Sequence, residues 1–188
     1  MASSLWLMRH GETAWSLSGQ HTGSTDLPLT AEGERKAVAV GKTLAGKKFA
    51  AVYVSPMTRA RETCRIAGYS EGAIVTADLH EWNYGSYEGL TTADIHKTAP
   101  HWTIWTAPPP GGETIAQVAD RARRVIHSTP DGDVAIFGHG HMLRVLAACW
   151  LEVDPTMGRC FALSTGSISV LGHERETPVL QTWNQTTF

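Results

Sequence analysis

Leu5-Trp6-Leu7-Met8-Arg9-His10-Gly11-Glu12-Thr13 is the stretch of sequence that decides the fold. The short apolar run over residues 4–8 predicts a buried β-strand. Glycines, serines and threonines are frequent over residues 9–29, and this composition predicts a long loop. Arg9 and His10 therefore stand where a strand ends, at the edge of a sheet.

The rest of the chain alternates between strand and helix patterns. Thr30 is a suitable cap for one helix, and Ser55 is a suitable cap for another that has Pro56 at its first position. The predicted strands cover residues 51–55, 133–137, 167–172 and 178–183, and the predicted helices cover 31–46, the segment from Ser55-Pro56 onward, 112–128 and 140–151. This alternation predicts an α/β fold, a three-layer α/β/α sandwich with a mostly parallel central sheet and an antiparallel edge strand.

Composition limits the kind of protein. The 188 residues fit one domain over 1–188, with the Pro- and Gly-rich stretch 107–112 as a surface loop. A formal net charge of −2 argues against nucleic acid as a partner. The three cysteines are widely spaced among apolar neighbours, which favours core positions over a disulfide framework or a zinc finger. The apolar run near the N-terminus is too short for a signal peptide or a membrane span, so we expect a cytoplasmic protein that does not bind membranes.

Three predicted strands end on residues with a common chemical use. Arg9 and His10 follow the first strand, Arg59 follows the strand over 51–55, and His139 follows the strand over 133–137. Ligands of open α/β sheets bind beyond the carboxyl ends of the strands, so these four side chains are expected to converge. Arginine forks match phosphate oxygens, and histidines attack or donate protons. The set predicts a pocket for a phosphate dianion.

Other interpretations of these residues stay open at this point. His139-Gly140-His141 also fits a pair of metal ligands, although no metal is needed where arginines already supply positive charge. Arg61 fits a solvated helix face or a structural salt bridge.

At the motif level the chain resembles the histidine phosphatase superfamily, in its phosphoglycerate-mutase-like branch. The resemblance rests on blocks in the family's order: Leu7-Met8-Arg9-His10-Gly11-Glu12-Thr13, Thr22-Gly23, Thr25-Asp26-Leu27-Pro28-Leu29-Thr30 with Gly33, Ser55-Pro56 to Thr63, Glu81-Trp82-Asn83-Tyr84-Gly85, and Gly138-His139-Gly140. Within this branch, the chain looks most like bacterial acid phosphatases of broad specificity and fungal sugar-bisphosphate phosphatases.

What this resemblance implies is a phosphohistidine mechanism without metal or cofactor. His10 would be the nucleophile and Glu81 the proton donor that later activates water. The phosphoryl oxygens would be held by Arg9, Arg59 and His139. The pocket would be completed by Ser16 (many relatives carry Asn there), Thr22, the Gly23 backbone and Gly140. His21 and Trp82 are further candidates for substrate contacts.

The resemblance alone does not distinguish a phosphatase from a mutase. Mutases of this branch carry an insertion with an adjacent arginine pair, whereas the adjacent pair Arg123-Arg124 here falls on the predicted helix 112–128 and is expected to face solvent. We therefore expect a phosphatase acting on small phosphomonoesters such as sugar phosphates. Mutase-type transfer and a non-catalytic regulatory role are the alternatives. The expected partner is a small phosphorylated metabolite, and a homodimer is left open.

Overall fold

A single six-stranded sheet organises the chain in the computed structural model, which describes residues 2–186. The strand order is β3-β2-β4-β1-β5-β6. The strands are β1 (Ala2–Arg9), β2 (Ala51–Val54), β3 (Ile74–Val75), β4 (Gly132–Gly138), β5 (Ile168–Glu174) and β6 (Thr177–Gln185). Pairing is parallel from β3 through β1 and antiparallel between β1 and β5 and between β5 and β6. The predicted fold class is confirmed.

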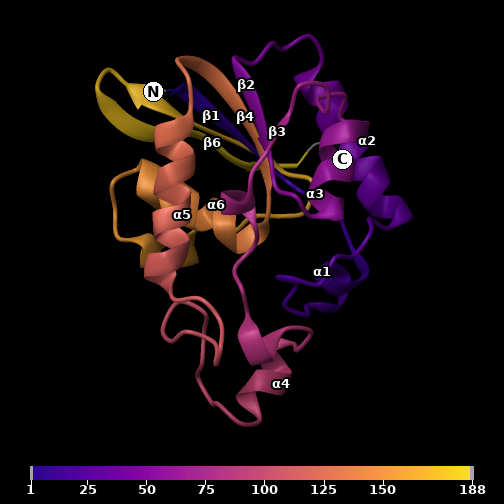
Figure 1. The fold of residues 1–188 in the computed structure, drawn as a ribbon, viewed down its shortest axis with the longest axis vertical. Coiled ribbons are helices and arrows are strands. Elements are labelled where there is room, and N and C mark those ends of the chain that lie inside the picture. Colours follow the sequence, from indigo (N-terminus) through magenta and orange to yellow (C-terminus); the bar gives the residue numbers. More distant parts are fainter. Residues whose placement is uncertain (1, 187–188) are drawn as a thin grey trace.

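Helices cover both faces of the sheet (Figure 1). They are α1 (Ala14–Ser18), α2 (Ala31–Leu44), α3 (Thr58–Ile66), α4 (Thr92–His96), α5 (Ile115–Ser128) and α6 (Gly140–Trp150), with short 3-10 turns over Ala77–Leu79, Gly85–Tyr87 and Pro155–Cys160. Because side chains alternate along a strand, Leu7 faces a core shared with α5 and α6, whereas Met8 faces a core shared with α2 and α3. Two cores on opposite faces make the three layers.

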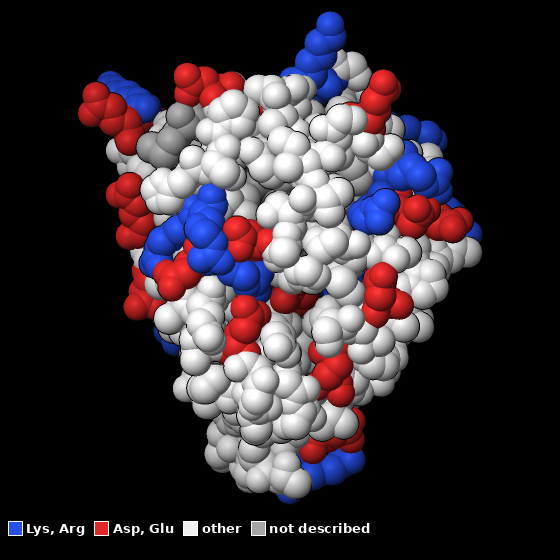
Figure 2. All heavy atoms as spheres, viewed as in Figure 1, with Lys and Arg blue, Asp and Glu red and all other residues white. Residues whose placement is uncertain are grey.

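The end of the sheet toward which the parallel strands run is covered by loops and short helices. In Figure 1, α1 and α4 lie beyond this end of the sheet. Helix α1 lies inside the segment predicted as loop, and it forms because Thr13 and Ser16 make a reciprocal capping box. On the face seen in Figure 2, acidic and basic side chains are interspersed.

Two local predictions were wrong. Helix α3 starts at Thr58 with Met57 as its cap residue, not at Ser55-Pro56. The Ser55 hydroxyl lies 2.7 Å from Nε2 of His139, and the Asp26 carboxylate accepts the Thr58 N–H at 2.8 Å in its place. Of the cysteines, Cys64 is buried and Cys149 half-buried, but Cys160 is exposed on the turn that follows α6.

None of the helices within residues 2–186 has both the length and the apolar character needed to cross a bilayer.

The loop after β1 is held by a close backbone approach to the start of α2. A Cβ added to Gly33 would lie 2.2 Å from the Glu12 carbonyl oxygen, and one added to Gly11 would lie 2.3 Å from the Gly33 carbonyl oxygen. Only glycine allows backbones to come this close. The contact fixes the chain directly after His10.

This contact predicts a stability loss for Gly33→Ala. The added methyl group meets backbone atoms that have no rotamer to change, so we expect the free energy of unfolding to fall by about 1–3 kcal/mol although alanine is the better helix former. Urea unfolding of the variant measures this. Glu34→Ala, at an exposed neighbouring position, is the control and should change stability by about 0.5 kcal/mol or less. A Gly33→Ala variant as stable as the control would contradict the prediction.

Candidate active site

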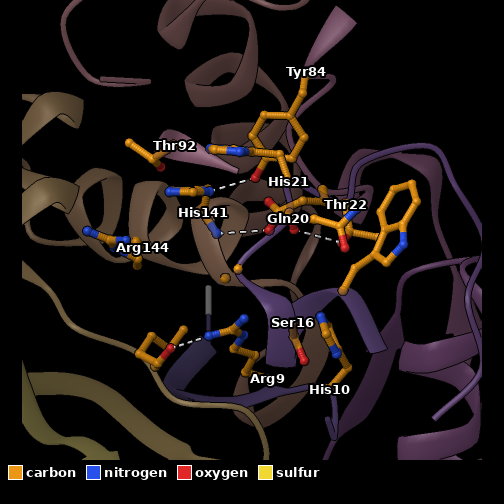
Figure 3. A pocket seen from close by; sticks show the side chains of 15 residues that line it. Arg9, His10, Ser16, Gln20, His21, Thr22, Tyr84, Thr92, His141 and Arg144 are labelled. Carbon is orange, nitrogen blue, oxygen red and sulfur yellow. Dashed lines mark hydrogen bonds between the residues drawn. The ribbon is translucent and has the colours of Figure 1, made fainter. Parts of the chain in front are cut away.

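The four side chains predicted to converge do meet at the carboxyl ends of β1, β2 and β4. The rings of His10 and His139 lie 5.2 Å apart between centroids, and Arg59 Nε donates to His139 Nδ1 at 3.2 Å. A cavity of about 240 Å³ opens beside them (Figure 3). Its lining comprises Arg9, His10, Trp15, Ser16, Gly19, Gln20, His21, Thr22, Glu81, Tyr84, Thr92, Gly140, His141, Arg144 and Leu163.

His10 presents an unprotonated nitrogen for chemistry. Its Nδ1 lies 2.7 Å from the Gly11 carbonyl oxygen, and because a carbonyl only accepts hydrogen bonds, Nδ1 carries the proton. The lone pair is therefore on Nε2. Burial, followed by the nearby cations of Arg9 and Arg59, holds the pKa of His10 well below its ordinary value. A neutral imidazole with a fixed tautomer is the form that attacks phosphorus.

His139 and Arg59 form a buried pair that lies outside the lining of the cavity. Nδ1 of His139 accepts from Arg59, so Nε2 is protonated and donates to the Ser55 hydroxyl. With both ring nitrogens engaged, His139 is not arranged as a metal ligand together with His141. Among residues 2–186, no group of three or more His, Cys, Asp or Glu side chains is arranged to hold a metal ion.

The Arg59 guanidinium is held by backbone carbonyls of the loop before α2. It donates to the carbonyl oxygens of Thr22 at 3.1 Å, Gly23 at 3.0 Å and Thr25 at 2.9 Å. These contacts neutralise part of the desolvation cost of a cation that is fully buried. Arg59 thereby ties the loop that carries Thr22 to α3.

Unlike Arg59, Arg9 lines the cavity directly. Its Nη1 donates to the Leu163 carbonyl, and its guanidinium packs against Gly140, where an added Cβ would lie 3.3 Å from the Arg9 Cζ. Within residues 2–186, Nε of Arg9 stands out as a buried side-chain donor without a hydrogen-bond partner. A buried N–H left unpaired is costly, so this arginine is held in place at an energetic cost.

Glu81 places its carboxylate at the N-terminus of α6. Oε1 accepts the N–H groups of Trp82 at 2.9 Å and Met142 at 2.8 Å, and Oε2 accepts the N–H of His141 at 3.0 Å. The side chain is 7% exposed and lines the cavity. Helix N-termini favour acidic groups, so these amides fix the carboxyl group beside the His10 pocket.

Most of the remaining predicted site residues line the cavity, but not all of them do. Ser16, Thr22, Gly140 and His21 line the cavity. Gly23 does not belong to that lining. Its N–H donates to the Glu88 carboxylate at 2.9 Å and is therefore not free to bind a ligand. Glu88 thus has the structural role that a loop carboxylate usually has.

The prediction that Trp82 contacts the substrate was wrong. Trp82 is fully buried, and its indole N–H donates to the Glu113 carbonyl at 2.8 Å, so its side chain is part of the core and does not touch the cavity.

Several lining residues were not predicted. Arg144 lies one turn beyond Gly140 on α6, a helix that is mostly apolar apart from His141 and Arg144. Its guanidinium lies 4.7 Å from the Trp105 ring centroid and donates to the carbonyls of Gly158 and Arg159. The sequence feature that could have predicted Arg144 is its position as the one Lys or Arg in a mostly apolar helix that starts at the site.

The half-buried His141 and the buried Tyr84 form a second pair on the cavity wall. The Tyr84 hydroxyl lies 2.6 Å from His141 Nδ1. Burial raises the pKa of Tyr84, and burial together with Arg144 lowers the pKa of His141, so Tyr84 is the donor and His141 is a neutral acceptor.

The fold and the site together define an α/β protein with a cationic, histidine-bearing pocket suited to a phosphate group. The family model of the histidine phosphatase superfamily (branch 1) matches residues 5–186, and the chain belongs to this superfamily. An acid phosphatase of Mycobacterium tuberculosis is 40% identical over 176 residues, which cover 90% of this chain and 86% of the relative. A sedoheptulose 1,7-bisphosphatase of Saccharomyces cerevisiae is 35% identical over 179 residues, which cover 77% and 66%.

Solved structures agree. An open-reading-frame product of Mycobacterium tuberculosis superposes with a TM-score of 0.93 at 38% identity, and the match covers 98% of both chains. The resemblance found in the motifs is thus confirmed for both family and fold.

The buried histidines predict that acid destabilises the fold. Burial, as the largest cause, lowers the pKa of His10, His139 and His141 in the folded protein. In the unfolded chain each takes up a proton near pH ~6.5, so below that pH the unfolded state binds more protons and stability falls. The loss is up to about 1.4 kcal/mol per pH unit for each histidine, until the pH reaches the lowered pKa.

Urea unfolding at about pH 7.5 and about pH 5.5 measures this dependence. His141→Gln removes one of the three groups and should flatten it. Equal stability of the unsubstituted protein at both pH values would refute the account.

Proposed function

We propose that this protein is a metal-independent phosphatase that hydrolyses small phosphomonoesters through a phosphohistidine on His10. The observation that carries the proposal is the His10 ring, whose Nδ1–H is fixed on the Gly11 carbonyl while the ring lines the cavity beside Arg9. The membership of the superfamily and the two phosphatase relatives support it.

In the first step, Nε2 of His10 attacks phosphorus. An N–P bond forms, the bond from phosphorus to the ester oxygen breaks, and the Glu81 carboxylic acid gives its proton to the leaving oxygen. Oε2 accepts only one amide N–H, so it keeps a lone pair for this proton. Arg9, which lines the cavity, places its guanidinium charge beside the entering dianion. Arg59 supplies positive charge beside the reacting ring, and the neutral His139 accepts from Arg59 and helps to hold it there.

In the second step, Glu81 takes a proton from water as the water oxygen attacks the phosphohistidine. The N–P bond breaks, inorganic phosphate leaves, and His10 and the Glu81 acid are restored. The sum is ester plus water to alcohol plus phosphate. General acid–base assistance of this kind contributes roughly 10²–10⁴-fold.

Two alternatives fit the site less well. The adjacent arginines that a mutase would need at the cavity lie elsewhere: Arg123 pairs with Asp120 at 3.1 Å and Arg124 with Asp78 at 2.7 Å, both exposed on α5. A purely regulatory role would not require the fixed His10 tautomer or the amide-bound Glu81 carboxyl. A cytoplasmic location and a homodimer stay predictions.

The substrate class follows from the outer part of the cavity. Beyond Arg9 and His10, the wall carries the Arg144 cation, the hydroxyl of Thr92, the amide of Gln20 and the His21 ring. These groups match hydroxyls and a second anionic group rather than an apolar alcohol. We therefore favour sugar phosphates and related phosphorylated metabolites as substrates.

His10→Ala should abolish hydrolysis of 4-nitrophenyl phosphate, because the attacking nitrogen is removed. Phosphate release measures the loss, and acid-labile phosphate on the unsubstituted protein after quenching shows the intermediate. Thr43→Ala, at an exposed position on α2 that does not line the cavity, is the control. Normal turnover by His10→Ala would refute the mechanism.

The alternatives are tested with the same protein. Conversion of 3-phosphoglycerate after priming by a bisphosphate, without net phosphate release, would show a mutase. Loss of hydrolysis in EDTA would show that a metal is required, and we expect no loss.

Arg144→Gln should raise KM for some substrates and not for others. We expect KM to rise about 10-fold for sugar phosphates that carry a second anionic group, which corresponds to one lost charge-assisted hydrogen bond of about 1.4 kcal/mol. KM for 4-nitrophenyl phosphate should change by less than about 2-fold. Steady-state kinetics on both substrates measure this. An equal effect on both would mean that Arg144 acts on the phosphate pocket itself.

A further inference from the structure

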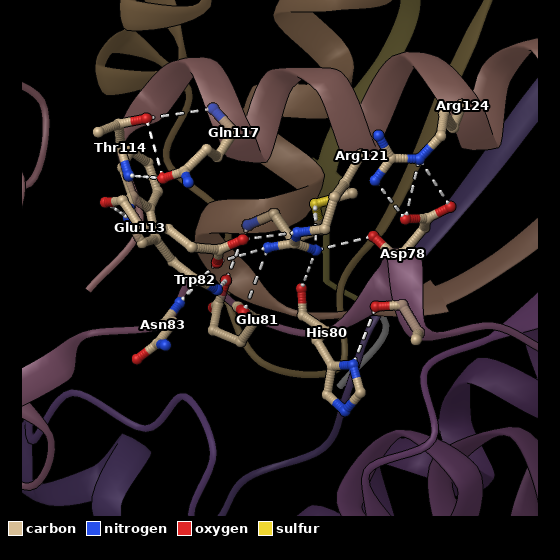
Figure 4. A network of polar contacts seen from close by, with 12 residues as sticks. Asp78, His80, Glu81, Trp82, Asn83, Glu113, Thr114, Gln117, Arg121 and Arg124 are labelled. Atoms are coloured by element: carbon tan, nitrogen blue, oxygen red, sulfur yellow. Dashed lines mark hydrogen bonds and ion pairs between the residues drawn. The ribbon is translucent and has the colours of Figure 1, made fainter. Parts of the chain in front are cut away.

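Arg121 of α5 holds the backbone on which Glu81 stands (Figure 4). Its Nη1 donates to the carbonyl oxygens of Asp78 at 2.8 Å and His80 at 2.9 Å, and Nη2 lies 3.5 Å from the Glu81 carbonyl oxygen. Its Nε and Nη2 form a two-pronged ion pair with the Glu113 carboxylate, each at 2.9 Å. One guanidinium thus spans the chain leading into Glu81.

Glu113 holds the chain on the other side of Glu81. Its carboxylate accepts the Asn83 N–H at 2.9 Å, its carbonyl accepts the indole N–H of Trp82 at 2.8 Å, and its own N–H donates to the Asn83 carbonyl at 3.0 Å. Arg121 and Glu113 together therefore grip the residues before and after Glu81. We call this set the Arg121–Glu113 clamp.

Besides the clamp, the Glu81 segment is held by the buried Trp82 side chain and by the α6 amides that donate to the Glu81 carboxylate. It lies between two 3-10 turns and belongs to no strand or helix. Glu81 also borders two cavities: the one beside His10, and another of about 300 Å³ lined by Gly23, Ser24, Ala77, His80, Glu81, Asn83, Glu113 and Arg121. On the two sides where Glu81 borders a cavity, packing contacts are missing, and hydrogen bonds hold the backbone there.

The surroundings of the clamp make it stiff. The Arg121 and Glu113 side chains are 12% and 22% exposed. Arg124 lies one turn further along α5 and pairs with Asp78, and these two side chains are 58% and 31% exposed. A two-pronged pair that is largely out of water keeps its geometry, and an exposed pair contributes little.

We propose that Arg121 is a positioning residue for Glu81: the clamp sets where the carboxyl group stands relative to the ester oxygen that leaves. This inference rests on the acid role proposed for Glu81. Catalytic groups are sensitive to displacements of about 1 Å, which cost up to about 10²-fold in rate. Loss of the clamp should thus weaken proton donation without removing the nucleophile.

The test is a series of phosphate monoesters with leaving groups of increasing pKa, from 4-nitrophenyl through phenyl to glycerol phosphate. The ratio kcat/KM covers the steps through departure of the alcohol, and poor leaving groups depend most on the acid. For Arg121→Gln we expect a loss of less than about 3-fold on 4-nitrophenyl phosphate and about 10- to 100-fold on glycerol phosphate. The plot of log kcat/KM against leaving-group pKa becomes steeper.

Matched variants complete the experiment. Arg124→Gln removes the same charge from the same helix and should leave the slope unchanged. Arg121→Lys should recover part of the loss, and Glu113→Gln should steepen the slope less than Arg121→Gln. Because a slope compares substrates on one preparation, a partly unfolded variant lowers all rates equally and leaves it unchanged.

The outcomes are distinct. A uniform loss across the series in Arg121→Gln and Glu113→Gln, with the unsubstituted protein active, would overturn the positioning role and leave the proposed phosphatase intact. No hydrolysis of any ester by the unsubstituted protein would overturn the proposed function and this inference with it.

Discussion

The parallel pairing of β4 with both β1 and β2 is the constraint on which the rest depends. It aligns Arg9 with Gly138 and Val54 with Phe137, so the three strands end at one level. The N–H of His10 then donates to the Gly138 carbonyl at 3.0 Å, and that of Ser55 donates to the Phe137 carbonyl at 3.0 Å. Side chains that are more than a hundred residues apart in sequence thereby meet without any loop having to place them.

Such convergence creates an electrostatic problem. Two arginines and two histidines are crowded into a space largely closed to water, and burial lowers the pKa of all four. The histidines stay neutral, and backbone carbonyls accept from both guanidiniums. The two guanidinium charges remain, with the Glu81 carboxylate as a nearby opposite charge. A cationic site that is closed to water suits an anionic group such as phosphate.

The sequence predicted what depends on local signals. Strand ends, glycines and helix caps are short-range features, so the α/β layers and the meeting of His10, Arg59 and His139 followed from them. The predicted start of α3 failed because His139, far along the chain, engages the Ser55 hydroxyl. The predicted substrate contact of Trp82 was wrong because only the packed structure shows that its indole is buried. Arg144 was missed because its place at the cavity depends on which face α6 turns to the sheet.

The proposed nucleophile and the proposed acid are thus positioned by different means. His10 stands directly at a strand end, where sheet hydrogen bonds fix its backbone and the Gly11 carbonyl fixes its tautomer. Glu81 stands on irregular chain, and its place is the sum of amides from α6 and the Arg121–Glu113 clamp from α5. Side-chain clamps change with single substitutions, whereas strand ends do not. Variation in the clamp would therefore alter which leaving groups are assisted while the phosphate pocket stays the same.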